Sequence, residues 1–423
     1  MSLSDVETRL LACLDEHAIV DDLVHLVRVP SVTGTDAESE LQHEQSESLR
    51  RWGFDVDAWK LDLDELGGHP DFPGSEAERS EGYGLVGTIG DGVPALVLQG
   101  HVDVVPTGDL EQWHDHDPFS GRIVDGVLHG RGACDMKAGV AANLAVARVL
   151  GTSGVKLERA FGFHSVVSEE DGGLGAFATM LRGHTADAAV LTEPTSGRIV
   201  IANAGALTFE IRVHGRAAHG STRLEGVSAF DAFLPINAAL RELEQERNAV
   251  PQPLFLDTTL PYPISIGRVN AGDWASSVPD LLIAEGRLGV ALGEPTADAR
   301  AALEHTVAAA CARDPWLRDH PATVTWPGGQ FASGRIDSAH PLVSQVSASI
   351  VAAEGRPEPR LTAAPYGSDL RLYSNLGGIP TLHYGPGDVR FAHAPREQVN
   401  VNEVISVARA MLVLAARQCG AHF

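Results

Sequence analysis

Three apolar segments that end in histidine or glutamate constrain the fold of this 423-residue chain most strongly. They cover residues 95–101, 159–170 and 188–193, and they end in His101, a glutamate pair and Glu193. Apolar runs of this length that alternate with helical patterns predict an α/β fold with a mainly parallel β-sheet. Because sites on such sheets lie at the carboxyl ends of the strands, we expect the three polar ends to meet.

The first segment leads into the pattern His-x-Asp at His101 and Asp103. Residues two apart lie on the same side of an extended chain. A neutral imidazole can bind a metal ion through one nitrogen and donate its other N–H to a carboxylate. The pattern therefore indicates a metal ligand with its orienting partner. A strand-end histidine satisfied by the backbone is the alternative that this triplet leaves open.

Further candidates for a hydrolytic metal site are Asp135, Glu169, Glu170, Glu193 and His393. Such a site needs several nitrogen or oxygen ligands, a water molecule and a carboxylate that can take the proton of that water. Simpler interpretations exist: a helix N-cap for Asp135, a solvated loop for the glutamate pair and a surface position for His393. Successive residues of an extended chain point in opposite directions, so one glutamate can bind metal while its neighbour faces the substrate.

Composition narrows the classes of partner. The formal net charge of −24 argues against nucleic acid and anionic membranes. The four cysteines are far apart in the sequence, which indicates free thiols in a reducing compartment. The N-terminus lacks the basic start and apolar core of a signal peptide, and no apolar run approaches the roughly 18 residues that span a bilayer. We therefore expect a cytoplasmic protein.

The pattern changes near residue 206, where half-exposed strands and amphipathic helices follow one another in the order β-α-β-β-α-β. This order is typical of a ferredoxin-like α+β domain. We therefore expect an inserted domain over residues 206–328 and a catalytic domain made of residues 1–205 and 329–423. Residues 63–82 are rich in glycine, proline and acids, which predicts a surface loop.

The chain as a whole resembles a family of co-catalytic zinc hydrolases. The family includes acetylornithine deacetylase, succinyl-diaminopimelate desuccinylase, aminoacylase and the glutamate carboxypeptidases. The matching segments occur in family order and spacing and are GHVDVVP, DPFSGRIVDGVLHGRGACDMKAGVAA, VVSEEDGG, LTEPT, GRAAHGS, GGIPTLHYGPG and AHAPREQV. His-x-Asp alone is weak evidence for the family, whereas the full set is highly specific.

The resemblance implies two zinc ions bridged by Asp135. His101 and Glu193 would complete one metal site, and Glu170 and His393 the other. Oxygen and nitrogen ligands without thiolate suit zinc and also accept cobalt or manganese.

The resemblance also implies roles for four residues that bind no metal. Asp103 would orient His101, and Glu169 would be the general base. His219 would stabilise the oxyanion in the active site of the neighbouring subunit, which implies a homodimer through the inserted domain. Arg371 would hold the carboxylate of the substrate, a task that suits the guanidinium group. A strand-end His219 and a helix-surface Arg371 are the simpler interpretations.

Two positions depart from the family pattern. Ser277 stands where relatives often have asparagine, and Gly289 stands where they often have arginine, with Arg287 two residues before it. Both positions can touch the substrate in relatives, so these departures bear on the substrate and leave the chemistry unchanged.

The resemblance implies a metal-dependent amidohydrolase that removes an acyl group from a small N-acyl amino acid, with acetylornithine deacetylase-like activity as the first choice. The alternatives are a succinyl-diaminopimelate desuccinylase, a dipeptidase or carboxypeptidase, and a hydrolase of a specialised amide. A binding protein that keeps the fold without catalysis is a hypothesis of another class, and the intact ligand set with Glu169 argues against it.

Overall fold

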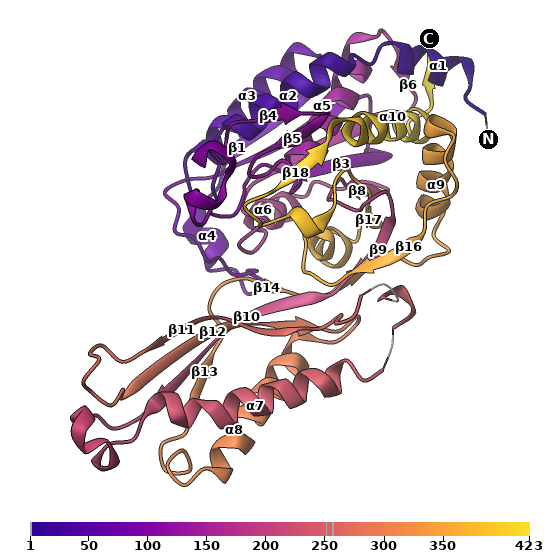
Figure 1. Cartoon of the computed structure of the whole chain (residues 1–423). Coiled ribbons are helices and arrows are strands. Elements are labelled where there is room, and N and C mark those ends of the chain that lie inside the picture. Colours follow the sequence, from indigo (N-terminus) through magenta and orange to yellow (C-terminus); the bar gives the residue numbers. More distant parts are fainter. Residues whose placement is uncertain (1, 251, 256–257) are drawn as a thin grey trace. The chain divides into compact units, whose positions relative to one another are not determined.

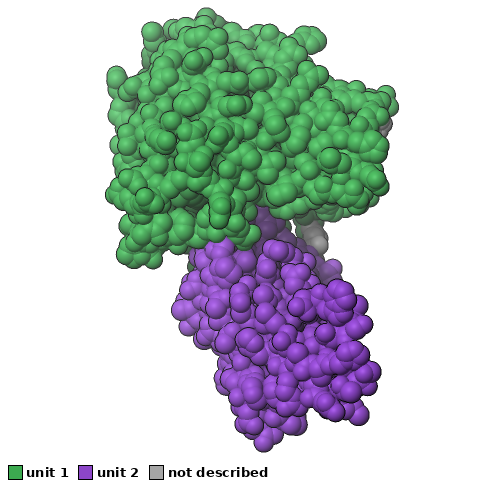
Figure 2. Space-filling view, turned by 90° about the vertical axis from the view of Figure 1, so that its left-hand side faces the viewer, with its two compact units in different colours: residues 1–202, 335–362, 369–423 green, residues 203–334, 363–368 purple. Residues whose placement is uncertain are grey.

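The computed structural model describes residues 2–250, 252–255 and 258–423. It divides into two compact units (Figure 2). The first unit comprises residues 1–202, 335–362 and 369–423, and the second comprises residues 203–334 and 363–368. The second unit extends beyond the predicted end at residue 328, because strand β14 (Gln330–Phe331) pairs with β10 (Gly205–His214) of that unit.

Among the described residues, nine strands form one sheet, which lies mainly in the first unit (Figure 1). Its order is β1-β2-β7-β3-β8-β17-β9-β15, and β16 pairs with β9. The strands are β1 (Asp55–Lys60), β2 (Tyr83–Ile89), β3 (Leu96–His101), β7 (Phe161–Val166), β8 (Ala189–Leu191), β9 (Ile199–Asn203), β15 (Gly334–Arg335), β16 (Leu361–Ala364) and β17 (Thr381–His383). β7, β3, β8 and β17 are parallel, whereas β1, β2 and β9 join antiparallel. The predicted α/β fold is confirmed, with its parallel strands at the centre of the sheet.

The central strands and the helix beside them form the core of the first unit. β3 and β7 are buried along their whole length, and this includes the polar side chains of Gln99, His164 and Ser165. α5 (Lys137–Thr152) contacts both strands and is almost wholly buried. A Cβ atom on Gly139 would lie 2.1 Å from the carbonyl oxygen of Thr192. Glycine therefore allows the start of α5 to approach the end of β8, which brings two parts of the site together.

Seven further α-helices belong to the described part of the first unit. They are α1 (Asp5–Ala12), α2 (Glu16–Arg28), α3 (Ala37–Arg51), α4 (Leu63–Gly67), α6 (Leu174–Leu181), α9 (Pro341–Glu354) and α10 (Val401–Gln418). Asp15 caps α2 by accepting hydrogen bonds from the backbone N–H groups of His17 and Ala18, so α2 begins as a helix separate from α1. α10 packs against α9, α5 and α1.

Two small sheets complete the first unit. One has the order β18-β5-β4, and the other pairs β19 with β6. Their strands are β4 (Arg122–Val124), β5 (Val127–His129), β6 (Lys156–Leu157), β18 (Gln398–Asn400) and β19 (Ala421–His422). The first of these sheets ties the C-terminal loop that carries His393 to the segment before Asp135, because Gln398 pairs with His129.

The second unit has the predicted β-α-β-β-α-β order. Its elements are β10, α7 (Ala229–Arg247), β11 (Ile264–Ala271), β12 (Leu281–Val290), α8 (Thr296–Arg313) and β13 (Thr323–Thr325). The antiparallel sheet has the order β11-β12-β10-β13. Phe209, Ile211 and Val213 of β10 pack in one core with residues of α7 and α8. Alternation along β10 thus gives one buried and one more exposed face.

The predicted surface loop over residues 63–82 differs from the structure. It contains the short helix α4, and the side chain of Arg79 is only 5% exposed because it reaches carboxylates beneath the loop. The four cysteines are free, as predicted. In the described residues, every helix is too short or too polar to cross a membrane.

Candidate metal centre

The predicted site residues of the first unit come together at the carboxyl ends of the central parallel strands. His101 is the last residue of β3, Glu169 and Glu170 follow β7, and Glu193 follows β8. His101 pairs with Val166, the last residue of β7, so the two strands end side by side. The parallel register therefore places the three polar ends at one edge of the sheet.

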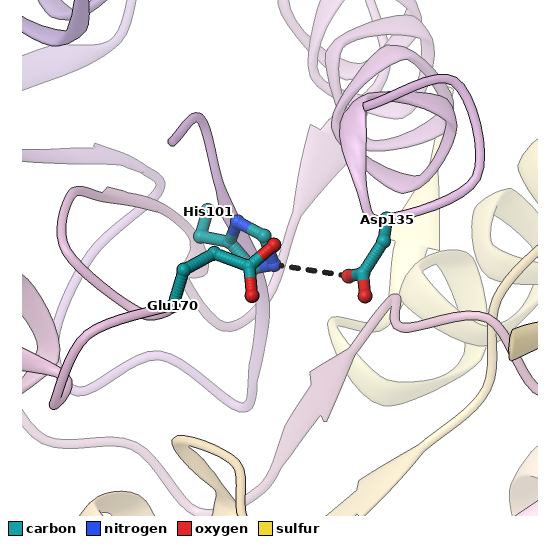
Figure 3. Close-up of side chains that lie close together, drawn as sticks. All are labelled: His101, Asp135 and Glu170. Carbon is teal, nitrogen blue, oxygen red and sulfur yellow. Dashed lines mark hydrogen bonds and ion pairs between the residues drawn. The ribbon is translucent and has the colours of Figure 1, made fainter. Parts of the chain in front are cut away.

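His101, Asp135 and Glu170 face one another (Figure 3). Nε2 of His101 lies 3.3 Å from Oδ1 of Asp135. Oδ2 of Asp135 lies 3.6 Å from Nε2 of His393, and the same nitrogen lies 3.0 Å from Oε2 of Glu170. The Asp135 carboxylate thus stands between two imidazole rings, with one oxygen turned to each.

The carboxylates of this cluster fit a cation. Glu193 Oε1 lies 3.9 Å from Nε2 of His101. Within the described part of the chain, Oε1 of Glu170 and Oε1 of Glu193 are buried without a hydrogen-bond partner, which is costly for a polar atom. Ligand atoms of His101, Asp135 and Glu170 lie within 4.8 Å of one another, as do those of His101, Glu169 and Glu193. These oxygen and nitrogen donors suit zinc and similar divalent ions.

Asp103 connects both sides of the cluster. Its carboxylate accepts hydrogen bonds from the backbone N–H groups of Glu169 and Glu170, both at 3.1 Å. Nδ1 of His101 lies 2.9 Å from the carbonyl oxygen of Asp103 and 3.5 Å from its carboxylate. The closer contact of the histidine ring is therefore with the backbone, and the carboxylate mainly holds the loop that carries the glutamate pair.

Glu397 holds the loop that carries Asp135, although it is not among the site residues predicted from the sequence. Oε1 of Glu397 accepts hydrogen bonds from the backbone N–H groups of Cys134 and Asp135, both at 3.0 Å. Its other oxygen pairs with Arg131, and both side chains are buried. Glu397 lies in the segment AHAPREQV that carries the family resemblance, which is the one signal that could have found it.

The pKa shifts of the glutamates in the cluster follow from burial and from the excess of acidic over basic side chains there. Burial raises the pKa of Glu169 well above its ordinary value, and the nearby Glu193 carboxylate raises it further. Burial also raises the pKa of Glu193 well above its ordinary value. Buried anions beside one another favour protonation, and a divalent cation would supply the compensating positive charge.

Arg371 is buried, at 3% exposure. Its Nη2 donates a 2.7 Å hydrogen bond to the carbonyl oxygen of Gly172, at the end of the loop that carries Glu169. Burial lowers the pKa of Arg371 to about 10, while the Asp369 and Glu169 carboxylates act in the opposite direction. The Arg371 side chain thus contacts the backbone of the loop that carries Glu169 and Glu170.

His219 lies in the second unit after β10, with an exposed side chain, and is not part of the cluster in the first unit. Its backbone pairs with Ser277 in an isolated antiparallel bridge. The serine that departs from the family pattern therefore lies beside the histidine. At Gly289, a Cβ atom would lie 2.8 Å from the backbone of Tyr262, so this site has no room for the arginine of relatives.

Comparisons with known proteins identify a family and several relatives of this chain. The model of peptidase family M20/M25/M40 matches residues 97–417. The N-formyl-4-amino-5-aminomethyl-2-methylpyrimidine deformylase of Halalkalibacterium halodurans is 27% identical over 397 residues, covering 87% of this chain and 86% of the relative. A succinyl-diaminopimelate desuccinylase of Rhodopseudomonas palustris is 29% identical over 379 residues, covering 85% and 88%. The crystal structure of human carnosine dipeptidase 1 has the same fold, with a TM-score of 0.76 at 13% identity, covering 98% of this chain and all of that one.

Proposed function

This chain belongs to peptidase family M20/M25/M40 and is a metal-dependent hydrolase of amide bonds, and on that premise we propose that it removes an acyl group from an N-acyl amino acid or a closely related amide. The observation that carries the proposal is the Asp135 carboxylate between two imidazole rings, with buried carboxylates of Glu169 and Glu193 beside it.

We propose a ligand set for two divalent ions. Asp135 would bridge them, since one oxygen faces each histidine. His101 and Glu193 would complete one site, and Glu170 and His393 the other, as the buried oxygens without partners on both glutamates support. We propose zinc as the metal, and cobalt or manganese would fit the same donors.

The residues around the ions determine the course of the proposed reaction. A divalent ion bound there supplies a Lewis acid for the amide carbonyl and lowers the pKa of water. Glu169, whose backbone N–H is held by Asp103, accepts a proton from the attacking water at its carboxylate. It then gives this proton to the nitrogen of the leaving amine, which completes general acid–base catalysis.

The acyl group is the part of the proposal with several candidates. Acetylornithine deacetylase-like activity is our first choice from the sequence, and the two relatives are named for removal of a formyl and of a succinyl group. We propose that a short acyl group on a small primary amine is the substrate class. Desuccinylation is the second candidate, because the match with the desuccinylase covers 88% of the length of that relative.

We expect the metal-loaded protein to hydrolyse at least one member of a panel of formyl, acetyl and succinyl amino acids and dipeptides. Free amine released from each compound would be measured with added zinc, cobalt or manganese. The same panel run with chelated protein serves as control. If the metal-loaded protein hydrolyses no member of the panel, the proposed substrate class is wrong.

We further propose that the second unit forms a homodimer and that His219 stabilises the oxyanion in the site of the other copy. Within the described residues, β11 pairs on one side only, with β12. Val269 of β11 is 45% exposed, and Trp274, in the segment that follows β11, is 73% exposed. An edge strand with unpaired N–H and C=O groups is suited to pair with a second copy about a two-fold axis.

The four free cysteines support a cytoplasmic location.

Val269→Lys is expected to convert the dimer to a monomer, because two like charges would oppose each other across the paired edges. Light scattering after size-exclusion chromatography at micromolar protein measures this change. Val93→Lys, at a residue of the first unit that is 50% exposed, is the matched control and should leave the mass unchanged. A monomeric wild-type protein would contradict the dimer.

A further inference from the structure

The loop that carries the glutamate pair has an unusual backbone. Ser168 has φ of 64°, and Gly172 and Gly173 have φ of 151° and 85°. A positive φ is uncommon for a residue other than glycine and persists where the surroundings over-determine it. Since Glu169 and Glu170 lie between these positions, the contacts that hold residues 168–172 also determine where the two carboxylates point.

Two buried carboxylates hold this loop besides Asp103. Glu38 of α3 accepts a 3.0 Å hydrogen bond from the backbone N–H of Ser168. Asp171 accepts hydrogen bonds from the hydroxyl group of Ser75 at 2.9 Å and from the backbone N–H of Ala77 at 2.9 Å. Asp171 also pairs with the hydroxyl group of Ser168. One carboxylate thus ties the loop to α3, and the other ties it to residues 75–77.

Arg79 joins these two carboxylates. Its Nη1 lies 3.3 Å from Oε2 of Glu38, and its Nη2 lies 3.2 Å from Oδ1 of Asp171. The three side chains are buried, at 5%, 2% and 3% exposure. Burial works against the positive charge of Arg79, but the Glu38, Asp171 and Asp103 carboxylates raise its pKa above the ordinary value. A planar guanidinium can contact two carboxylates at once, whereas an ammonium group acts as a point charge.

We propose that Arg79 is a positioning residue: by joining Glu38 to Asp171, it holds residues 168–172 in the conformation that presents Glu169 and Glu170 to the metal centre. The inference rests on the proposed function for the roles of the two glutamates. Arg79 itself touches neither glutamate side chain among the contacts that the structure describes, so its effect passes through the loop backbone.

The proposal is tested with Arg79→Met, Arg79→Lys and the control Arg417→Met. Arg417 also makes a two-point ion pair, with Glu7 at 2.7 and 3.2 Å in the first unit, but it does not contact the loop. Three quantities are measured: hydrogen exchange of the backbone amides of residues 168–172 in chelated protein, affinity for zinc by competition with a chromophoric chelator, and kcat and KM on the best substrate.

In Arg79→Met we expect exchange of the Glu169 and Glu170 amides to rise about tenfold or more, as local opening becomes easier. Zinc affinity and kcat should each fall about 10- to 100-fold, which is the usual loss when a residue that supports the metal ligands is changed. KM should change less than kcat. Arg79→Lys should lie between Arg79→Met and wild type. Arg417→Met should resemble wild type in all three quantities even if its thermal stability falls.

Folded Arg79→Met with wild-type exchange and zinc affinity would overturn the proposal. If Arg79→Met does not fold, Arg79→Lys decides: wild-type exchange and affinity would show that bridging is not required, and a defect in both with a native far-UV spectrum would support it. Exchange and zinc affinity are read without substrate. A failure of the acyl amino acid panel therefore leaves this test intact, and a negative result here leaves the proposed activity untouched.

Discussion

Replacing Glu169 by glutamine is expected to lower kcat by about 10²–10⁴-fold, the range that general acid–base catalysis contributes. Glutamine keeps the size of the side chain and the backbone N–H that donates to Asp103, but it cannot take a proton from water. The metal content should stay close to that of the wild type, because the proposed ligands are unchanged. Steady-state kinetics and elemental analysis of the same preparation check both outcomes.

Glu170→Gln is the matched control, since it changes the neighbouring residue by the same atoms. Its carboxylate lies 3.0 Å from the His393 ring, so this variant should lose metal as well as activity. If instead Glu169→Gln loses the metal and Glu170→Gln keeps it, the roles of the two glutamates are reversed.

Asp135→Ala is expected to reduce activity by about 10³-fold or more, because bound metal contributes several kcal/mol to the transition state and about 1.4 kcal/mol corresponds to a factor of ten. The variant should also lose the thermal stabilisation by zinc. Ligand at 100 times its dissociation constant stabilises a native state by about 2.7 kcal/mol, so zinc should raise the Tm of the wild type and leave that of Asp135→Ala unchanged. Differential scanning fluorimetry with and without zinc measures this difference.

Asp109→Ala provides the control for a lost aspartate in the same unit, because Asp109 is exposed and accepts a hydrogen bond only from its local turn among the described contacts. It should keep wild-type activity and a wild-type response to zinc. An Asp135→Ala protein that still gains stability from zinc would contradict a bridging role for this residue.

The central strands and the inserted unit are predictable because their patterns are strong. β3 and β7 lie in mainly apolar segments that polar residues follow, and β10 alternates between buried and more exposed positions. α6 is not predictable in this way. Its residues Leu174–Met180 are all buried, so the helix has no polar face and no amphipathic period, and Gly173 begins it without a side-chain cap.

The start of β10 illustrates a second limit. Residues 199–207 form a nearly unbroken apolar run, yet Ile199–Asn203 pairs in the large sheet as β9 and Gly205–His214 pairs in the sheet of the second unit. One run of sequence thus serves two sheets. Hydrophobic pattern reports burial, and it does not tell which partner strand provides that burial.

The residues of the site likewise divide into those that the sequence predicts by itself and those that it does not. His101, the glutamate pair and Glu193 are predictable from chemistry, because they end apolar strands. Asp135 and His393 lie in loops, so only the resemblance to a family connects them with the rest. Glu397 holds the backbone N–H of Asp135 from a distance of 262 residues in sequence, a separation over which no local pattern carries information.

The position of β17 in the sheet has a consequence for how the chain is made. β17 (Thr381–His383) lies between β8 and β9 in the sheet. In the sequence, however, β8 and β9 come before nearly the whole second unit, and β17 comes after it. During synthesis, β8 keeps an open edge until the ribosome has passed the insertion, and pairing across such a separation is slow because a long loop must close first. His393 arrives later still. The proposed ligands His101, Asp135, Glu170 and Glu193 are therefore synthesised well before His393, and the full set of five exists only when the last part of the chain has been made.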